Sequence, residues 1–241
     1  MNEVPDLSHL ESDGVISEID ISKRMPVTGI TLENLPSRSI NSAFGIRDEG
    51  GKKVLDISFT DLASGISIAS AFDNLALQRE ISGFQGPIFP AILSKQVFTL
   101  KDAVDKPTIT ISVPFENTRS SIINPSVLTA TDSLSYDQTE FSIEHDMSEN
   151  GYMLRDCLSF AKRLRQERLD GGAIPNLDLE ISFNNSISFE TQRDPDIMLE
   201  EFMVLANTIA AKYFIDNKIP GIYRNQLLRI SQEEKFNLIE E

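Results

Sequence analysis

The sequence contains little cysteine and histidine and no long apolar run. Cys157 is its one cysteine, which excludes an internal disulfide framework. With only His9 and His145 beside it, a zinc site built from cysteine and histidine cannot be assembled. No stretch approaches the roughly 18 to 20 consecutive apolar residues of a membrane-spanning helix, and the N-terminus, MNEVPDLSHLESDG, is acidic, unlike a secretory signal. We therefore expect no membrane association and a reducing intracellular location such as the cytoplasm.

Positive charge is also scarce. The 241 residues include 22 Lys and Arg against 37 Asp and Glu, which gives a formal net charge of -15. Because nucleic-acid affinity depends largely on phosphate neutralisation, this charge opposes non-specific attraction to RNA or DNA. Any RNA contact would have to be local. Solubility alone also explains an acidic surface of this kind.

Strand-like patterns dominate the first half of the chain. Residues 1–25 are polar and acidic, and we interpret them as a flexible lead-in to a single domain over residues 26–241. The segment SAFGIRDEGGKKVLDISF predicts a β-hairpin, because its paired glycines allow a tight turn. The run TITISV and residues 121–129 predict further strands, and residues 68–81 predict an amphipathic helix.

Helical patterns dominate the second half. Residues 154–169 have helical period, and residues 195–217 predict a long helix that begins at a proline. Between them, residues 178–183 and 186–189 predict a second hairpin. Together the elements predict an α+β fold, with a mixed or antiparallel sheet and packed helices.

The helix over residues 154–169 has one apolar and one basic side. Arg163 and Arg165 lie on the basic side, which either contacts phosphates or is simply a solvated face. Arg168 falls among the apolar positions instead. A guanidinium there needs a carboxylate or phosphate partner, because an unpaired buried charge costs about 3 to 5 kcal/mol. The candidate partners are Glu180, Glu200 and Glu201.

The helix over residues 195–217 is apolar around most of its circumference. Met198, Phe202 and Tyr213 belong to one apolar stripe, and an adjacent stripe includes Leu199 and Phe214. A helix with this pattern is typical of the centre of a domain.

Three blocks of the second half resemble a known family. They are LRDCLSFAKRLRQERLDGGAIPNLDLEISF, MLEEFMVLANTIAAKYF and IPGIYRNQ. In this order and spacing they closely resemble the RNB catalytic domain of the ribonuclease II and ribonuclease R family. The first half resembles the same family through Asp61 and the segment PIFPAILSKQVFTL, so the resemblance extends over roughly residues 24–225.

The resemblance implies processive 3′-to-5′ hydrolysis of single-stranded RNA at divalent metal held by clustered aspartates. In the family one aspartate is followed six residues later by Asp-x-Asp-Asp, because magnesium prefers oxygen ligands and several carboxylates must converge on one phosphate. Here the aligned positions are Glu33, Ser39, Asn41 and Ser42. One carboxylate of four is left, and serine and asparagine are weak magnesium ligands. We expect little or no metal-dependent hydrolysis and no cofactor.

The resemblance also implies an incomplete domain. The chain matches about two thirds of the family domain, and the family's later H-F-T-S-P-I-R-R motif, with its phosphate-contacting arginine, does not appear. The leading hypothesis is therefore an RNB-like binding or scaffolding protein without nuclease activity. Its acidic charge favours a protein partner. Residual contact with single-stranded RNA would involve Arg163, Arg165, Arg193 and Arg224. For Arg193 a salt bridge to Glu190, Asp194 or Asp196 competes with this role.

Two alternatives remain open. One is an active 3′-to-5′ exoribonuclease, in which magnesium is held by Glu33 with carboxylates such as Asp48 or Asp61, or by a site that a second chain completes. The other is a partner-binding protein without RNA affinity.

Overall fold

The residues that the computed structural model describes form two compact units, residues 1–139 and 140–241. The described residues are 19–33, 40–79, 88–89, 93, 98–100, 104–173, 179–181, 187–189 and 192–223. Most of the expected lead-in, residues 1–18, lies outside this description. The expectation of one domain over residues 26–241 stays a prediction.

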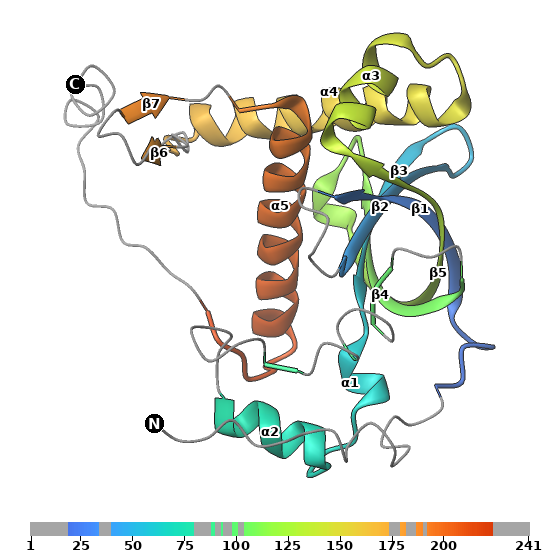
Figure 1. The fold of residues 1–241 in the computed structure, drawn as a ribbon, viewed down its shortest axis with the longest axis vertical. Helices are drawn as coiled ribbons and strands as arrows, with labels where there is room; N and C mark the ends of the chain where they lie inside the picture. The colour runs from blue at the N-terminus through green and yellow to red at the C-terminus, as the bar shows by residue number, and fades with distance from the viewer. Residues whose placement is uncertain are drawn as a thin grey trace. The chain divides into compact units, whose positions relative to one another are not determined.

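A closed five-stranded barrel forms the first unit (Figure 1). Its strands are β1 (Met25–Glu33), β2 (Ser42–Asp48), β3 (Lys53–Thr60), β4 (Lys106–Pro114) and β5 (Ile122–Ser135). Each strand pairs antiparallel with the next one along the chain. With an odd number of strands, the first and last strands of such a meander run in the same direction. The barrel accordingly closes through a parallel β1–β5 pair.

The hairpin that the sequence predicts is confirmed as β2 and β3, paired from Ser42–Phe59 to Asp48–Lys53. Gly50 and Gly51 form its turn with φ angles of +66° and +84°, which side-chain-bearing residues rarely adopt. The backbone N–H of Gly51 donates to the Asp48 carboxylate at 2.8 Å. Turn chemistry and apolar alternation therefore specify the same register.

Buried hydroxyl groups connect neighbouring strands on one face of the barrel sheet. Ser58 on β3 bonds to Thr110 on β4 at 2.7 Å, and Ser126 on β5 bonds to both Thr110 and Thr108. Buried polar groups are tolerated when they are hydrogen-bonded in this way. These side chains explain why the strands are not uniformly aliphatic despite being buried.

A buried carboxylate extends the same polar row. Asp56 on β3 accepts from Ser112 at 2.5 Å and from the Arg47 guanidinium at 2.8 Å. Burial raises the pKa of Asp56 above its ordinary value, although Ser112 and Arg47 both favour the ionised form.

Strands β1 and β2 approach each other unusually closely at two glycines. A Cβ added to Gly45 would collide with the backbone oxygen of Thr28, and one added to Gly29 would lie 2.9 Å from the backbone oxygen of Phe44. Beside this point the β1–β5 register shifts by one residue, and the Thr131 hydroxyl donates to the Gly29 carbonyl at 3.1 Å. The barrel therefore bends where only glycine fits.

Replacing Gly45 with alanine is expected to destabilise the barrel by about 2 kcal/mol or more, because the colliding atom belongs to the backbone and cannot rotate away. The measurement is urea unfolding followed by circular dichroism. Gly50→Asn is the control: nothing lies within 4 Å of an added Cβ there, and asparagine tolerates a positive φ. Equal losses in both variants would contradict the close-packing account.

Short helices follow β3 in the first unit. They are α1 (Leu62–Gly65) and α2 (Ala71–Arg79), and the second confirms the helix predicted over residues 68–81, with a start at Ala71. A single 3₁₀ turn, Thr118–Ser120, links β4 to β5. The predicted strands TITISV and 121–129 are confirmed within β4 and β5, and β5 continues to Ser135.

Helices α4 (Glu149–Asp170) and α5 (Asp194–Asp216) form the core of the second unit. Leu154, Cys157 and Ala161 of α4 and Met198 and Phe202 of α5 are at most 1% exposed. Burial raises the pKa of the Cys157 thiol far above its ordinary value, so this cysteine stays protonated. The predicted second hairpin is confirmed as β6 (Leu179–Ile181) and β7 (Ile187–Phe189).

Two expectations for the helices need correction. Helix α3 (Tyr136–His145), which leads toward α4, was not predicted. The apolar pattern of α5 is typical of a helix at the centre of a domain, but none of its residues after Ala206 is buried, and Tyr213 and Ile215 are 43% and 65% exposed. Apolar periodicity shows which side chains can be buried, but burial also needs a neighbouring element. Among the described residues, none packs over the second half of α5 closely enough to bury it. None of the described helices has the length and apolar content needed to cross a membrane.

Candidate functional site

The aligned metal positions lie at the connection between β1 and β2. Glu33 is the last residue of β1, Asn41 precedes β2 and Ser42 begins it, whereas Ser39 lies outside the described residues. The two strands run antiparallel through the pair Ile30–Phe44, so Glu33 and Asn41 flank the same connection. The Asn41 carbonyl accepts the backbone N–H of Thr60 at 3.0 Å, and Ser42 pairs with Phe59 of β3.

Glu33 is held by the last strand of the barrel. The Ser133 hydroxyl donates to a Glu33 carboxylate oxygen at 3.0 Å and in turn accepts from the Thr31 hydroxyl at 2.9 Å. The parallel register Glu33–Ser135 of β1 and β5 brings these residues together. Sequence reasoning missed Ser133, because nothing in either strand alone reveals that the first strand pairs with the last.

The described donors at this connection do not fit a magnesium site. They comprise one carboxylate, already bonded to Ser133, one amide side chain and one hydroxyl. Magnesium is bound in proteins mainly by carboxylates, substrate phosphates and water, and neutral donors compensate its charge poorly.

The other carboxylates considered as ligands are engaged elsewhere. Asp48 accepts the Gly51 N–H in the β2–β3 turn. Asp61 begins α1 and bonds to the Arg24 guanidinium at 2.8 Å and to the Ser64 hydroxyl at 2.5 Å. Within the part of the chain that the structure describes, no three histidine, cysteine, aspartate or glutamate side chains are placed to hold a metal ion together.

Asp61 is a structural anchor between α1 and the start of β1. Burial favours its neutral form, but hydrogen bonds from Ser64 and Arg24 outweigh burial and lower its pKa below the ordinary value of 3.8. An aspartate with a lowered pKa stabilises the fold above the unfolded-state pKa, and this contribution is lost as the pH falls through the folded-state pKa.

Asp61→Asn is therefore expected to lower the free energy of unfolding by about 3 kcal/mol near neutral pH, because Arg24 loses its charged partner. Denaturant unfolding at about pH 7 and about pH 3.5 tests this, and the gap between variant and wild type should narrow at the lower pH. A gap that is the same at both pH values would show that the ionised carboxylate contributes nothing.

Two of the three candidate partners of Arg168, Glu200 and Glu201, are confirmed. Its guanidinium donates to Glu201 at 2.6 Å and to Glu200 at 3.1 Å, and Glu201 is only 2% exposed. The hydrogen bonds to Glu201 raise the pKa of Arg168 further above its ordinary value. Arg165 lies 3.5 Å from Glu200, which also accepts from Gln192 at 3.0 Å. Two arginines of α4 are thereby tied to two glutamates of α5.

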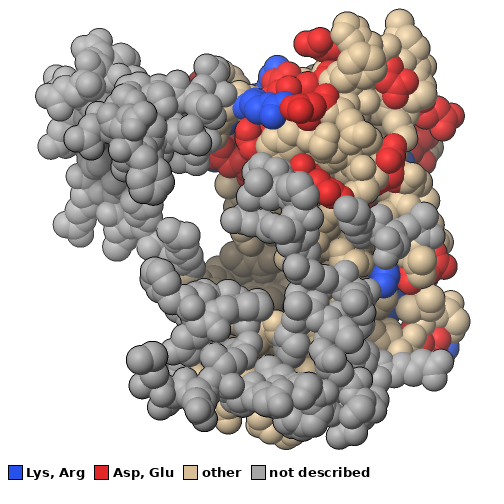
Figure 2. Space-filling model, viewed as in Figure 1, with Lys and Arg blue, Asp and Glu red and all other residues tan. Residues whose placement is uncertain are grey.

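The other candidate RNA-contacting arginines have different surroundings. Arg193 forms a two-pronged ion pair with Glu140, a partner that the sequence did not suggest, and its backbone N–H donates to the Asp196 carboxylate. Arg163 is 48% exposed, packs over the Phe160 ring at 4.8 Å and lies 3.8 Å from Glu167. Arg224 lies outside the described residues. On the face in Figure 2, acidic residues outnumber basic ones among the described residues, and basic side chains lie beside acidic ones.

Removing the buried partner of Arg168 is expected to cost much more than removing the exposed one. Glu201→Ala should lower the free energy of unfolding by about 3 to 5 kcal/mol, since an unpaired charge is left in the interior. Glu200 is 21% exposed, so Glu200→Ala should lower the free energy of unfolding by only about 1 kcal/mol.

Guanidinium chloride unfolding measures both variants. The double variant Arg168→Met and Glu201→Leu serves as the control, because it replaces the pair with apolar side chains of similar size and should recover most of the loss. If Glu200→Ala were as damaging as Glu201→Ala, burial would not be the deciding factor.

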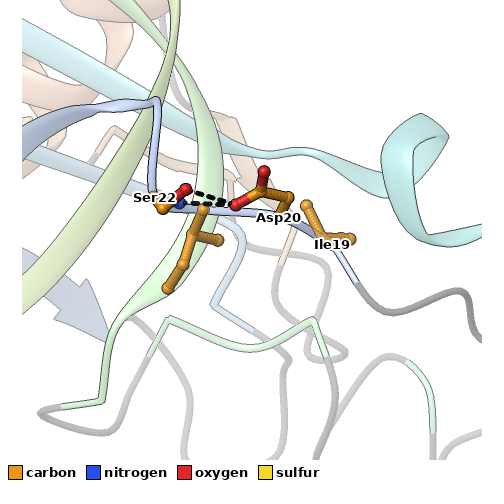
Figure 3. A pocket seen from close by; sticks show the side chains of 4 residues that line it. Ile19, Asp20 and Ser22 are labelled. Atoms are coloured by element: carbon orange, nitrogen blue, oxygen red, sulfur yellow. Dashed lines mark hydrogen bonds between the residues drawn. The ribbon is translucent and has the colours of Figure 1, made fainter.

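A shallow pocket lies beside the start of β1. Figure 3 shows the residues that line it, Ile19, Asp20, Ile21 and Ser22. The Asp20 carboxylate accepts from both the backbone N–H and the hydroxyl of Ser22, at 3.0 and 2.6 Å. These hydrogen bonds lower the pKa of Asp20. The polar groups shown there satisfy one another within a local turn, as in other turns capped by aspartate.

Comparison with known proteins assigns the chain to a family. A model of the RNB domain matches residues 24–240. The chain belongs to the RNB domain family. This confirms the resemblance noted in the sequence, and the α+β class is confirmed by the mixed sheet and packed helices of a fold that matches ribonuclease R.

Two solved structures and one curated protein illustrate the relationship. Ribonuclease R of Mycoplasmopsis pulmonis (strain UAB CTIP) is 26% identical, over 92% of this chain and 33% of that protein. The RNase R of Mycoplasma genitalium, solved with double-stranded RNA, has a TM-score of 0.74 at 18% identity, covering 90% of this chain and 43% of that one. Yeast Ssd1, described as a pseudonuclease, has a TM-score of 0.63 at 16% identity, covering 81% and 26%. The chain spans about a third of the length of the curated relative.

Proposed function

We propose that this RNB-family chain lacks nuclease activity and acts as a binding or scaffolding protein in RNA metabolism. The observation that carries the proposal is the donor set at the β1–β2 connection. The family's four aspartates correspond to Glu33, Ser39, Asn41 and Ser42, and Glu33 is hydrogen-bonded to Ser133. Metal-assisted phosphodiester hydrolysis needs several carboxylates to hold the ion and its water, so the proposal includes no resident metal or other cofactor.

The similarity to Ssd1 supports this proposal, because that structure is described as a pseudonuclease. Similarity to ribonuclease R favours the competing view of an active 3′-to-5′ exoribonuclease. In that view magnesium would be held by Glu33 with carboxylates of another segment or of a second chain. The chemistry of the donors favours the first view, since relatives this distant share the fold without necessarily sharing the reaction.

The charges favour a protein partner over RNA. Arg165 and Arg168 are paired with glutamates of α5, and Arg193 is paired with Glu140, so their charges are already compensated. The net charge of -15 adds long-range repulsion of a polyanion. Contact with single-stranded RNA remains part of the proposal at Arg163 and Arg224, and the RNA-bound RNase R structures are consistent with it.

Calorimetric titration with Mn²⁺ tests the metal site directly. The wild-type chain should give no saturable heat at millimolar Mn²⁺. A variant with Glu33→Asp, Ser39→Asp, Asn41→Asp and Ser42→Asp should bind the ion, because four carboxylates then converge on one connection. Glu33→Gln is the matched control. Saturable binding to the wild type that Glu33→Gln abolishes would contradict the proposal.

Titration with a labelled single-stranded RNA separates the two binding roles. Any RNA complex should be weak and should weaken further as the salt concentration rises, since phosphate contacts release counterions. Arg163→Gln should weaken it at low salt, whereas Lys212→Gln, which removes an exposed positive charge from α5, should not. If the RNA does not bind even at low salt, the chain is a protein-binding protein without RNA affinity.

A further inference from the structure

Three large apolar side chains are exposed where α3 turns into α4. Phe141, Met147 and Tyr152 are 63%, 76% and 56% exposed. We call these three residues the corner patch. Single exposed apolar residues are ordinary, but a group of large ones on one short segment is typical of an interaction surface. Aromatic and methionine side chains are also enriched in protein interfaces.

Local contacts hold the members of the corner patch in place. The Phe141 ring packs edge-on against the His145 ring, with 4.9 Å between ring centres. The Tyr152 hydroxyl lies 4.0 Å from the Met147 sulfur. The Arg155 guanidinium lies over the Tyr152 ring, 4.6 Å from its centre. The exposed groups are thus oriented before any partner arrives.

The backbone beneath the corner patch is also fixed. Arg155 donates to the backbone oxygens of Ile143 and Asp146, each at 2.9 Å, and so satisfies carbonyls at the end of α3. Gly151 lies so close to the backbone of Asp146 that any side chain there would collide with it. A preorganised surface loses little conformational entropy on binding.

Three acidic residues lie in the same segment as the corner patch. Glu144, 70% exposed, Asp146 and Glu149 all belong to the same segment. On the face in Figure 2, the described surface over α3 and α4 is acidic and uncharged, apart from a group of basic side chains that lie beside acidic ones where α4 meets α5. Arg155 is the basic side chain nearest to Tyr152 among the printed contacts, and its donors are taken up by carbonyls. The rim of this surface is therefore electrostatically negative.

We propose that the corner patch binds a basic segment of a protein partner, with apolar side chains of that segment packing on Phe141, Met147 and Tyr152. The acidic rim complements lysine and arginine and repels RNA phosphates. A second copy of this chain fits poorly, because a two-fold interface would bring two acidic rims together. The inference deepens the proposed binding function and rests on it only for the existence of a protein partner.

A labelled helical peptide of about 14 leucine and lysine residues, with its leucines on one face, is a suitable probe for fluorescence anisotropy with the full chain. Phe141→Ser with Met147→Ser should weaken its binding by at least about tenfold, since two anchors are lost. Glu144→Lys should weaken it at low salt and have a smaller effect at high salt. A peptide with glutamate in place of lysine should not bind.

Ile215→Ser is the matched control, because Ile215 is 65% exposed on another helix, α5. It should leave peptide affinity unchanged. Equal affinity for wild type and the double serine variant would overturn the inference, as would failure of the peptide to bind at all. If the double serine variant lost RNA binding, the corner patch would bind RNA, and the inference would be wrong. If it lost a dimer that sedimentation velocity detects in the wild type, the patch would bind a second copy of the chain, and the inference would again be wrong. Metal titration tests the β1–β2 connection and does not depend on peptide binding. The inference about the corner patch and the proposal of an inactive nuclease can therefore fail separately.

Discussion

The parallel pairing of β1 with β5 is the constraint on which the first unit depends. A five-stranded meander can close only through a parallel pair, and this pair joins strands about 100 residues apart in the sequence. This pairing brings the Ser133 hydroxyl to the carboxylate of Glu33. Glu33 is the one acidic residue among the four positions aligned with the family's aspartates. The bend at Gly29 and Gly45 allows β1 and β2 to cross closely enough for the sheet to close.

Local patterns of the sequence predicted most elements but not their long-range partners. The Gly50-Gly51 turn specified the β2–β3 hairpin, and the proline near residue 195 marked the start of α5. The position of Arg168 among apolar residues correctly indicated an acidic partner. Helix α3 was missed because Tyr136–His145 follows directly on strand β5, with no intervening turn to mark its start. Ser133 and Glu140 were missed as partners because each depends on contacts between segments far apart in the chain.

Paired charges hold the two long helices of the second unit together. The basic side of α4 looked suitable for phosphates in the sequence, yet Arg165 and Arg168 lie against Glu200 and Glu201. These pairs hold α4 to α5, and the exposed side of the same unit is acidic and apolar at the α3–α4 corner. This combination is the reason for proposing a basic protein segment, and not RNA, as the partner of the corner patch.

The central claim is that the family fold persists here without its reaction, and degradation of a 5′-labelled single-stranded RNA tests it most directly. The RNA is incubated with purified protein and either Mg²⁺ or Mn²⁺. The account predicts that its length stays unchanged, because one carboxylate bonded to Ser133 cannot assemble the metal centre. Progressive shortening from the 3′ end that Glu33→Ala abolishes would contradict it.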